Sequence, residues 1–348
     1  MNIEQLILDA RTKNCSDIHI SEGMPLYYRI NGALKEDELL LSDGEIRGAI
    51  LEALTEKQRK QLEEGKDVDF AIQTTDGNRQ RVNVFRQQKK LAATIRLLNN
   101  KIPSLQELKL PKILDQLAGE PRGLVLITGP TGSGKSTTLA AMVNQINESR
   151  ACHIVTIEDP IEYVFTRKRS IIHQREVGED TESFASALRS VLREDPDVIL
   201  VGEMRDYETI SAAVTAAETG HLVLSTLHTT GAAQTIDRII DACPGETQNQ
   251  IRTQLSGILK GVVTQCLIPT ADGRGRVAAT EVLTGTDAAL NLIRENKCYQ
   301  MNSVMQAGSA FGMHTLNKDL VQWVHQGVIR PQDAFLYSND KRDLEQYL

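Results

Sequence analysis

The strongest constraint on the fold of this chain is a glycine-rich segment that lies between a predicted strand and a predicted helix. Residues 129–136 read Gly-Pro-Thr-Gly-Ser-Gly-Lys-Ser and match the phosphate-loop pattern G-x-x-x-x-G-K-[ST]. The apolar run 123–128 precedes them, and a helix is predicted to begin near Lys135 and to include residues 137–146. Glycines allow successive backbone N–H groups to point inward as a nest for an anion. The sequence therefore predicts a nucleoside-triphosphate site.

The same segment assigns roles to individual side chains. Lys135 is expected to reach the β- and γ-phosphates of ATP, and the hydroxyl of Ser136 is expected to bind Mg²⁺. The partial positive charge at the start of a helix adds to the attraction. The predicted nucleotide-binding residues are Gly129, Pro130, Thr131, Gly132, Ser133, Gly134, Lys135, Ser136 and Thr137.

Composition limits the classes of protein that remain. A length of 348 residues suggests two domains, each able to bury a core. The net charge of −7 and the aromatic content of 4% argue against a nucleic-acid-binding protein, which needs basic surface and stacking side chains. The five cysteines include no C-x-x-C pair, which argues against a zinc ribbon and fits a reducing compartment.

Targeting signals are missing from the sequence. The first residues, Met-Asn-Ile-Glu-Gln, do not resemble a secretory signal, and no stretch approaches 18 apolar residues. We therefore expect a cytoplasmic protein that meets a membrane only through a partner.

Residues 1–98 are predicted to form an α+β domain. Apolar spacing predicts a helix over residues 3–13, and a longer helix is predicted over 43–64. The predicted strands are 17–21, 26–30, 68–72, 79–86 and 91–97, with a hairpin turn at Asp76-Gly77. Residues 99–121 carry three prolines and are interpreted as an interdomain linker that includes a short helix over 104–118.

Residues 122–348 are predicted to form an α/β domain with a helical carboxyl-terminal region. Strand-like apolar runs alternate with amphipathic helices, and examples of such runs are 123–128, 154–157, 198–201, 222–225 and 277–283. This alternation predicts a mostly parallel sheet with helices on both faces. Catalytic groups are then expected at the carboxyl ends of the strands.

Two acidic segments follow predicted strands of this domain. Glu158, Asp159 and Glu162 come directly after the strand 154–157. An isolated surface turn has the same composition, but beside a phosphate loop Mg²⁺ and an attacking water need oxygen ligands. After the strand 198–201, Gly202 stands at the place where an aspartate usually binds Mg²⁺, and Glu203 is one residue further on. Glu203 is therefore expected to act through a water or as the base, which contributes about 10²- to 10⁴-fold to the rate.

Histidines and arginines supply further candidates. His228 follows the strand 222–226 and could sense the γ-phosphate, whereas His221 precedes the same strand and should lie at its opposite end. A structural role is the alternative for either histidine. Arginines that could stabilise a transferring phosphoryl group, if the site lies between subunits, are Arg189, Arg193, Arg205, Arg81, Arg86 and Arg96.

Taken together, these segments resemble the PilT family of type IV pilus retraction ATPases, within the secretion-ATPase superfamily. The resemblance runs from the segment 16–20 almost to the carboxyl end, with matching order and spacing. The motifs that carry it are 129–139 (GPTGSGKSTTL), 157–163 (IEDPIEY), 174–177 (QREV), 187–197 (ALRSVLREDPD), 202–206 (GEMRD), 215–221 (TAAETGH) and 226–229 (TLHT).

The resemblance implies a PAS-like amino-terminal domain, a RecA-like ATPase domain and a homohexameric ring that binds ATP and Mg²⁺ between subunits. It implies catalytic roles for Glu158, Glu162, Glu203 and His228, and for arginines of the amino-terminal domain, for which Arg81 and Arg96 are chosen. Metal contacts are implied for Ser136, Glu158 and Glu203. The implied partner is an inner-membrane pilus platform protein, so the motor would work at the cytoplasmic face of the inner membrane.

The absence of a long amino-terminal extension and of a tetracysteine segment favours retraction over pilus assembly or type II secretion. One departure leaves an alternative open. Family members that retract pili usually read A-I-R-N-L-I-R-E near the carboxyl end, whereas residues 288–295 place Leu290 where the arginine belongs. An accessory or assembly-side ATPase, a non-hydrolysing ATP-binding scaffold and, with less support, a nucleic-acid translocase or a small-molecule kinase are the other hypotheses.

Overall fold

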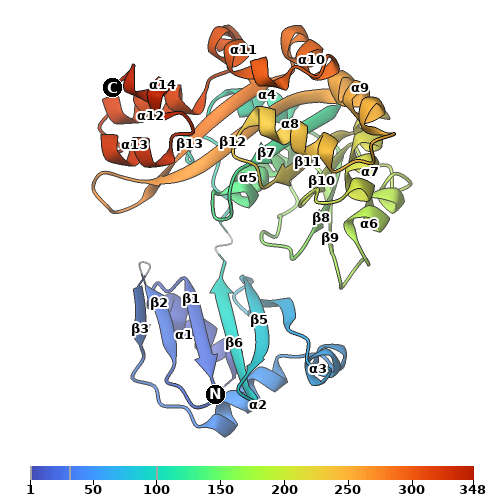
Figure 1. Cartoon of the computed structure of the whole chain (residues 1–348). Helices are drawn as coiled ribbons and strands as arrows, with labels where there is room; N and C mark the ends of the chain where they lie inside the picture. Colours follow the sequence, from blue (N-terminus) through green and yellow to red (C-terminus); the bar gives the residue numbers. More distant parts are fainter. Residues whose placement is uncertain (1, 31–32, 99–100) are drawn as a thin grey trace. The chain divides into compact units, whose positions relative to one another are not determined.

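The computed structural model describes residues 2–30, 33–98 and 101–348 (Figure 1). Within these residues the chain divides into two compact units, each built on its own sheet. The first consists of Met1–Lys101 with Pro160–Val164, and the second consists of Ile102–Asp159 with Phe165–Leu348. In the described residues no helix has the length and apolar content needed to cross a lipid bilayer.

The amino-terminal unit contains an antiparallel sheet in the order β3-β2-β1-β6-β5-β4. Its strands are β1 (Asp17–Ser21), β2 (Tyr27–Ile30), β3 (Ala33–Glu36), β4 (Val68–Gln73), β5 (Arg79–Gln87) and β6 (Lys90–Leu97). Its helices are α1 (Ile3–Thr12), α2 (Asp43–Glu52) and α3 (Glu56–Glu63). Most of these elements lie where the sequence predicts them.

Two elements of this unit differ from the expectation. The helix predicted over residues 43–64 is interrupted, because the side chain of Thr55 accepts a hydrogen bond from the N–H of Gln58 and the side chain of Gln58 accepts one from the N–H of Thr55. This reciprocal capping starts a new helix at Glu56. Strand β3 was not predicted, since its side chains are exposed and show no apolar alternation.

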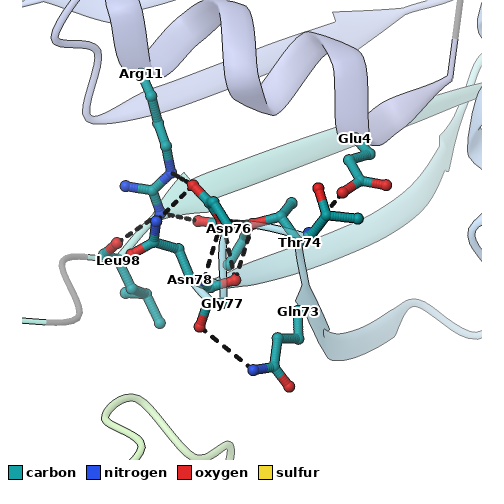
Figure 2. Close-up of polar contacts among 10 residues, drawn as sticks. Glu4, Arg11, Gln73, Thr74, Asp76, Gly77, Asn78 and Leu98 are labelled. Carbon is teal, nitrogen blue, oxygen red and sulfur yellow. Dashed lines mark hydrogen bonds and ion pairs between the residues drawn. The ribbon is translucent and has the colours of Figure 1, made fainter.

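The predicted hairpin turn at Asp76-Gly77 is confirmed. Gly77 has φ +81°, a conformation that glycine adopts without strain, and the Asp76 carboxylate accepts the N–H of Asn78 at 3.0 Å. Figure 2 shows that Arg11 of α1 reaches this turn, with Nε 3.8 Å from an Asp76 oxygen. Arg11 also donates to the carbonyl of Leu98 at 2.8 Å. Side chains of α1 therefore fix the turn to the end of the sheet.

The carboxyl-terminal unit contains a sheet in the order β13-β12-β7-β11-β10-β8-β9, parallel except for the β12–β13 pair. Its strands are β7 (Gly123–Thr128), β8 (His153–Glu158), β9 (Ile171–Glu176), β10 (Val198–Val201), β11 (Leu222–Leu227), β12 (Leu259–Pro269) and β13 (Arg276–Thr284).

Helices surround this sheet and continue beyond it. They are α4 (Ile113–Gly119), α5 (Lys135–Ser149), α6 (Phe184–Val191), α7 (Tyr207–Glu218), α8 (Ala232–Asp241), α9 (Gln248–Ile258), α10 (Asp287–Arg294), α11 (Met301–Ala307), α12 (Leu316–His325), α13 (Pro331–Tyr337) and α14 (Lys341–Glu345). Short 3₁₀ turns lie at Cys298–Gln300 and Ser309–Phe311.

Both faces of the sheet are covered, as the alternation predicted. On β7, Leu124 and Leu126 join a cluster with residues of α6 to α9, whereas Val125 and Ile127 join a second cluster with residues of α4 and α5. Successive strand residues point to opposite faces, so a continuous apolar run is what a strand buried on both sides requires. This burial fixes the strand whose end carries the phosphate loop.

The segment interpreted as a linker differs from the expectation. From Ile102 it belongs to the second unit, where Leu110 and Leu114 are buried among core residues. The helix predicted over residues 104–118 is limited to α4, because Lys109 has φ +55° and Pro111 follows, which together prevent a continuous helix. Residues 99 and 100 of the predicted linker lie outside the described residues.

Candidate nucleotide site

The phosphate loop joins β7 to α5 in a conformation that requires its glycines. Gly129, Gly132 and Gly134 have φ values of +141°, +78° and +90°. A Cβ atom on Gly129 would lie 2.2 Å from the carbonyl oxygen of Gln265 and 2.6 Å from Oγ of Ser133. Neither contact is physically possible. The loop therefore packs against β12 so closely that only glycine fits.

The loop also presents the polar groups that a phosphate needs. Lys135 is 8% exposed, and its Nζ donates to the carbonyls of Gly129 and Pro130 at 2.9 and 3.0 Å. The buried Oγ of Ser133 has no hydrogen-bond partner among the described residues, and no side chain there caps the start of α5. An unpaired hydroxyl beside a buried ammonium group fits a polyphosphate. Ser136 lies exposed on the first turn of α5, where it could bind Mg²⁺.

Strand β12 holds the loop from the side. The Gln265 side chain donates to the Ser133 carbonyl at 2.6 Å and accepts the Thr138 hydroxyl at 2.9 Å. The hydroxyls of Thr128 and Thr264 lie 2.8 Å apart. Sequence reasoning missed these contacts because β12 was not predicted. A buried Thr-Gln pair inside the apolar run 259–269 is the signal that could have found them.

Glu203 and His228 come together at the carboxyl ends of the neighbouring strands β10 and β11. The Glu203 side chain is 15% exposed, and its Oε2 lies 2.7 Å from Nε of Arg205 and 3.5 Å from Nε2 of His228. Burial, with a smaller contribution from the charge of Lys135, lowers the pKa of His228 below its usual range. The imidazole is therefore neutral near pH 7. His221 lies at the opposite end of β11, as expected.

Glu158 ends β8, the next strand of the sheet. Its Oε1 accepts the Thr156 hydroxyl at 2.6 Å and the Gln174 amide at 3.2 Å. A cavity of about 670 Å³ adjoins this edge and is lined by residues that include Asp159 and Glu203. In the described residues no group of three or more His, Cys, Asp or Glu converges as a metal site. Mg²⁺ does not need such a cage, because it binds through one or two carboxylates, waters and substrate phosphates.

Other predicted residues lie in the amino-terminal unit. Glu162 belongs to its segment Pro160–Val164, and Arg81 and Arg96 lie on β5 and β6. Nε of Arg81 lies 3.8 Å from Asp69, and Nε of Arg96 lies 3.0 Å from Asp17. The roles of Glu162, Arg81 and Arg96 at the nucleotide site stay predictions.

The remaining candidate arginines also have partners within their own units. Arg86 donates to the carbonyl of Leu62 in the amino-terminal unit. In the second unit, Arg189 lies 3.9 Å from Glu208, and Arg193 donates to the Arg189 carbonyl. Of the arginines proposed from the sequence, Arg205 is the one that the described structure places against Glu203.

Comparisons with known proteins show which proteins this chain is similar to. The family model of type II/IV secretion system proteins matches residues 1–338. The chain is 51% identical over 307 residues to a twitching motility protein of Neisseria gonorrhoeae, covering 88% of this chain and 82% of the relative. It is 47% identical over 335 residues to the type IV pilus retraction ATPase PilT of Pseudomonas aeruginosa, covering 96% and 97%. A crystal structure of the pilus retraction motor PilT with bound ADP superposes with a TM-score of 0.92 at 47% identity, covering 99% of both chains.

Proposed function

Because this chain belongs to the type II/IV secretion system proteins and, within them, to the PilT family, we propose that it is an ATP-hydrolysing motor that powers retraction of a type IV pilus. The observation that carries the proposal is the full-length match to a retraction motor with bound ADP. The same match confirms the expected fold class, an α/β protein with a PAS-like α+β domain followed by a RecA-like phosphate-loop domain.

The residues of the site can be given separate tasks in hydrolysis. The loop 129–136 binds the phosphates through its backbone N–H groups, and Lys135 adds a positive charge. Ser136, with Glu158 and Glu203 acting directly or through water, would hold Mg²⁺. When bound, Mg²⁺ would supply positive charge that stabilises the phosphate oxygens.

The carboxylate of Glu203 would accept a proton from the attacking water. Its ion pair with Arg205 at 2.7 Å holds that carboxylate in place at the carboxyl end of β10. His228 is neutral near pH 7 because burial lowers its pKa, so one ring nitrogen can donate a hydrogen bond to the γ-phosphate. Binding and water activation are thus assigned to different groups.

Assembly and location belong to the same proposal. We propose a homohexameric ring in which Arg81 and Arg96 stabilise phosphoryl transfer, and in which an inner-membrane platform protein docks the ring at the cytoplasmic face. Support comes from the relatives, which are a type IV pilus retraction ATPase and a pilus retraction motor, and from the composite site that the sequence predicts. The net charge of −7 disfavours a nucleic-acid translocase.

One observation favours a second candidate, an accessory or assembly-side pilus ATPase. Leu290 on α10 is half-buried and packs against the core cluster, at the position where the retraction motif carries an arginine. Asn291, Arg294 and Glu295 of the same motif are exposed. An aliphatic side chain at position 290 places no charge at this surface, where an arginine would place one.

A cell-based experiment separates the two candidates. In a deletion strain, retraction predicts excess surface pili that wild-type protein reduces and that Glu203→Gln does not. Glu345→Gln, an exposed change on α14, is the matched control and should act as wild type. Few or no pili in the deletion strain would refute retraction and favour assembly. Purified protein should release inorganic phosphate from ATP in the presence of Mg²⁺.

A further inference from the structure

A buried glutamate on β13 contacts the start of the helix that follows the His228 loop. Glu281 is 7% exposed, and its Oε1 accepts the N–H of Ala232 at 2.7 Å. Ala232 is the first residue of α8, directly after the loop 228–231. The described side chains of that loop do not cap α8, because its N-cap is Gly231. Glu281, which lies on β13, thus supplies the hydrogen-bond acceptor that the start of α8 requires.

The same carboxylate meets a second helix start. Burial raises the pKa of Glu281, whereas hydrogen bonding from the backbone N–H groups of Ala232 and Leu316 lowers it. Leu316 is the first residue of α12, in the carboxyl-terminal helical region. Burial dominates, so the pKa of this carboxyl group is raised above its usual range, and the group lies near the amino ends of both α8 and α12.

Neighbouring contacts fasten α12 to the same part of β13. The Asp319 carboxylate accepts the N–H and the hydroxyl of Thr280 at 2.7 and 3.0 Å. Val282 and His314 exchange backbone hydrogen bonds of 2.9 and 3.2 Å. Thr280 and Val282 flank Glu281 in sequence. Two β13 residues, one on each side of Glu281, thus contact α12 or the residues next to it.

A separate contact joins the His228 loop to the end of the chain. The Asn339 amide, which lies between α13 and α14, donates to the carbonyl of Thr230 at 2.8 Å. Asn339 is exposed, so this bond lies at the surface. The loop is consequently attached directly to the carboxyl-terminal segment at Thr230, and the residue that follows the loop, Ala232, is attached to β13.

The partner strand of β13 holds the phosphate loop. Glu281 pairs with Thr264, and Thr280 pairs with Gln265. Thr264 contacts Thr128, and Gln265 contacts Ser133 and Thr138. Of this strand pair, β12 therefore contacts the phosphate loop, and β13 contacts the start of α8 and the first turn of α12.

We propose that Glu281 is a positioning residue that couples the nucleotide site to the carboxyl-terminal helices α12 to α14. If the His228 loop shifts on ATP binding, the Ala232 N–H moves relative to a side chain of β13, the strand whose residues Thr280 and Val282 contact α12 and His314. Either α12 follows or a hydrogen bond breaks, which gives this packing two discrete arrangements. The inference rests on the ATP-dependent function proposed above and adds a route by which that function moves another part of the chain.

Glu281→Gln tests this coupling with little change in size. The amide keeps one acceptor oxygen, but its NH₂ group can no longer accept the second backbone N–H. We expect kcat for ATP hydrolysis to fall at least tenfold while KM changes less than twofold, since no phosphate contact is altered. Glu246→Gln, the same change at an exposed loop position, is the control and should behave as wild type.

Hydrogen exchange with a non-hydrolysable ATP analogue reads the coupling directly. In wild-type protein the analogue should alter exchange in residues 129–138, 228–232 and 316–325. In Glu281→Gln the change in exchange of residues 129–138 should remain, and the change in exchange of residues 316–325 should fall at least threefold. An unchanged α12 response or an unchanged kcat in the variant would overturn the inference.

Two further outcomes keep the test decisive. Asn339→Ala removes the surface contact to Thr230 without touching the core, and it should weaken the α12 response by a smaller factor. This variant serves if Glu281→Gln does not fold, and an unaltered α12 response in it would count against the coupling. If wild-type residues 129–138 do not respond to the analogue, the nucleotide function fails and the inference fails with it.

Discussion

Gln265 allows the support of the phosphate loop to be tested without touching the loop. It is 2% exposed and joins the Ser133 carbonyl to the Thr138 hydroxyl through bonds of 2.6 and 2.9 Å. Replacement by alanine removes both bonds and leaves the loop free to leave its binding arrangement. The glycines of the loop do not themselves oppose that motion, since glycine adopts many backbone conformations at similar energy.

The size of the effect follows from the two lost bonds. Each contributes about 0.5–1.5 kcal/mol net, so the binding arrangement loses roughly 1–3 kcal/mol relative to its alternatives. The apparent affinity for ATP is the intrinsic affinity multiplied by the fraction of molecules whose loop keeps the binding-competent arrangement. The dissociation constant for ATP should therefore rise about 5- to 150-fold.

Isothermal titration of ATP analogue into Gln265→Ala measures this directly. Gln306→Ala, a change of the same type at an exposed position on α11, should bind as wild type. Thermal unfolding of both variants separates loss of affinity from loss of the folded state. An affinity for Gln265→Ala within twofold of wild type would refute the claim that β12 organises the loop.

Further predictions concern the site itself. Glu203→Gln should lower kcat by about 10²- to 10⁴-fold and change ATP affinity less than threefold; equal turnover in the variant and wild type would contradict its role as base. Gly129→Ala should abolish ATP binding, because its Cβ would lie 2.2 Å from the Gln265 carbonyl oxygen; titration showing wild-type affinity would be inconsistent with the loop geometry. The pKa of His228 is lowered by burial, so the unfolded chain takes up its proton at a higher pH and stability falls as pH drops below about 6.5. His228→Asn should therefore reduce the loss of melting temperature between pH 7 and pH 5, and an unaltered loss would argue against a buried, neutral imidazole.

Much of the second unit could be predicted from local pattern. The strand 198–201 is observed with the predicted bounds, and the phosphate loop lies between strand and helix as its spacing required. Both follow from short-range causes, namely continuous apolar runs and glycines at left-handed positions. Prediction was weaker where a local capping signal was overlooked, as at Thr55, whose reciprocal capping with Gln58 divides one predicted helix.

Motif order and spacing in the sequence were enough to determine a phosphate-binding loop, acidic residues at strand ends and membership of a family. Tertiary structure decided which of these groups meet. The close approach of Glu203, Arg205 and His228 depends on β10 lying beside β11, and the support of the loop by Gln265 depends on β12 lying beside β7. Strand order is set by packing across the whole sheet, so residues more than a hundred positions apart, such as Ser133 and Gln265, become neighbours although no local pattern specifies which strands lie side by side. Burial then sets the charge of His228, which no residue pattern specifies.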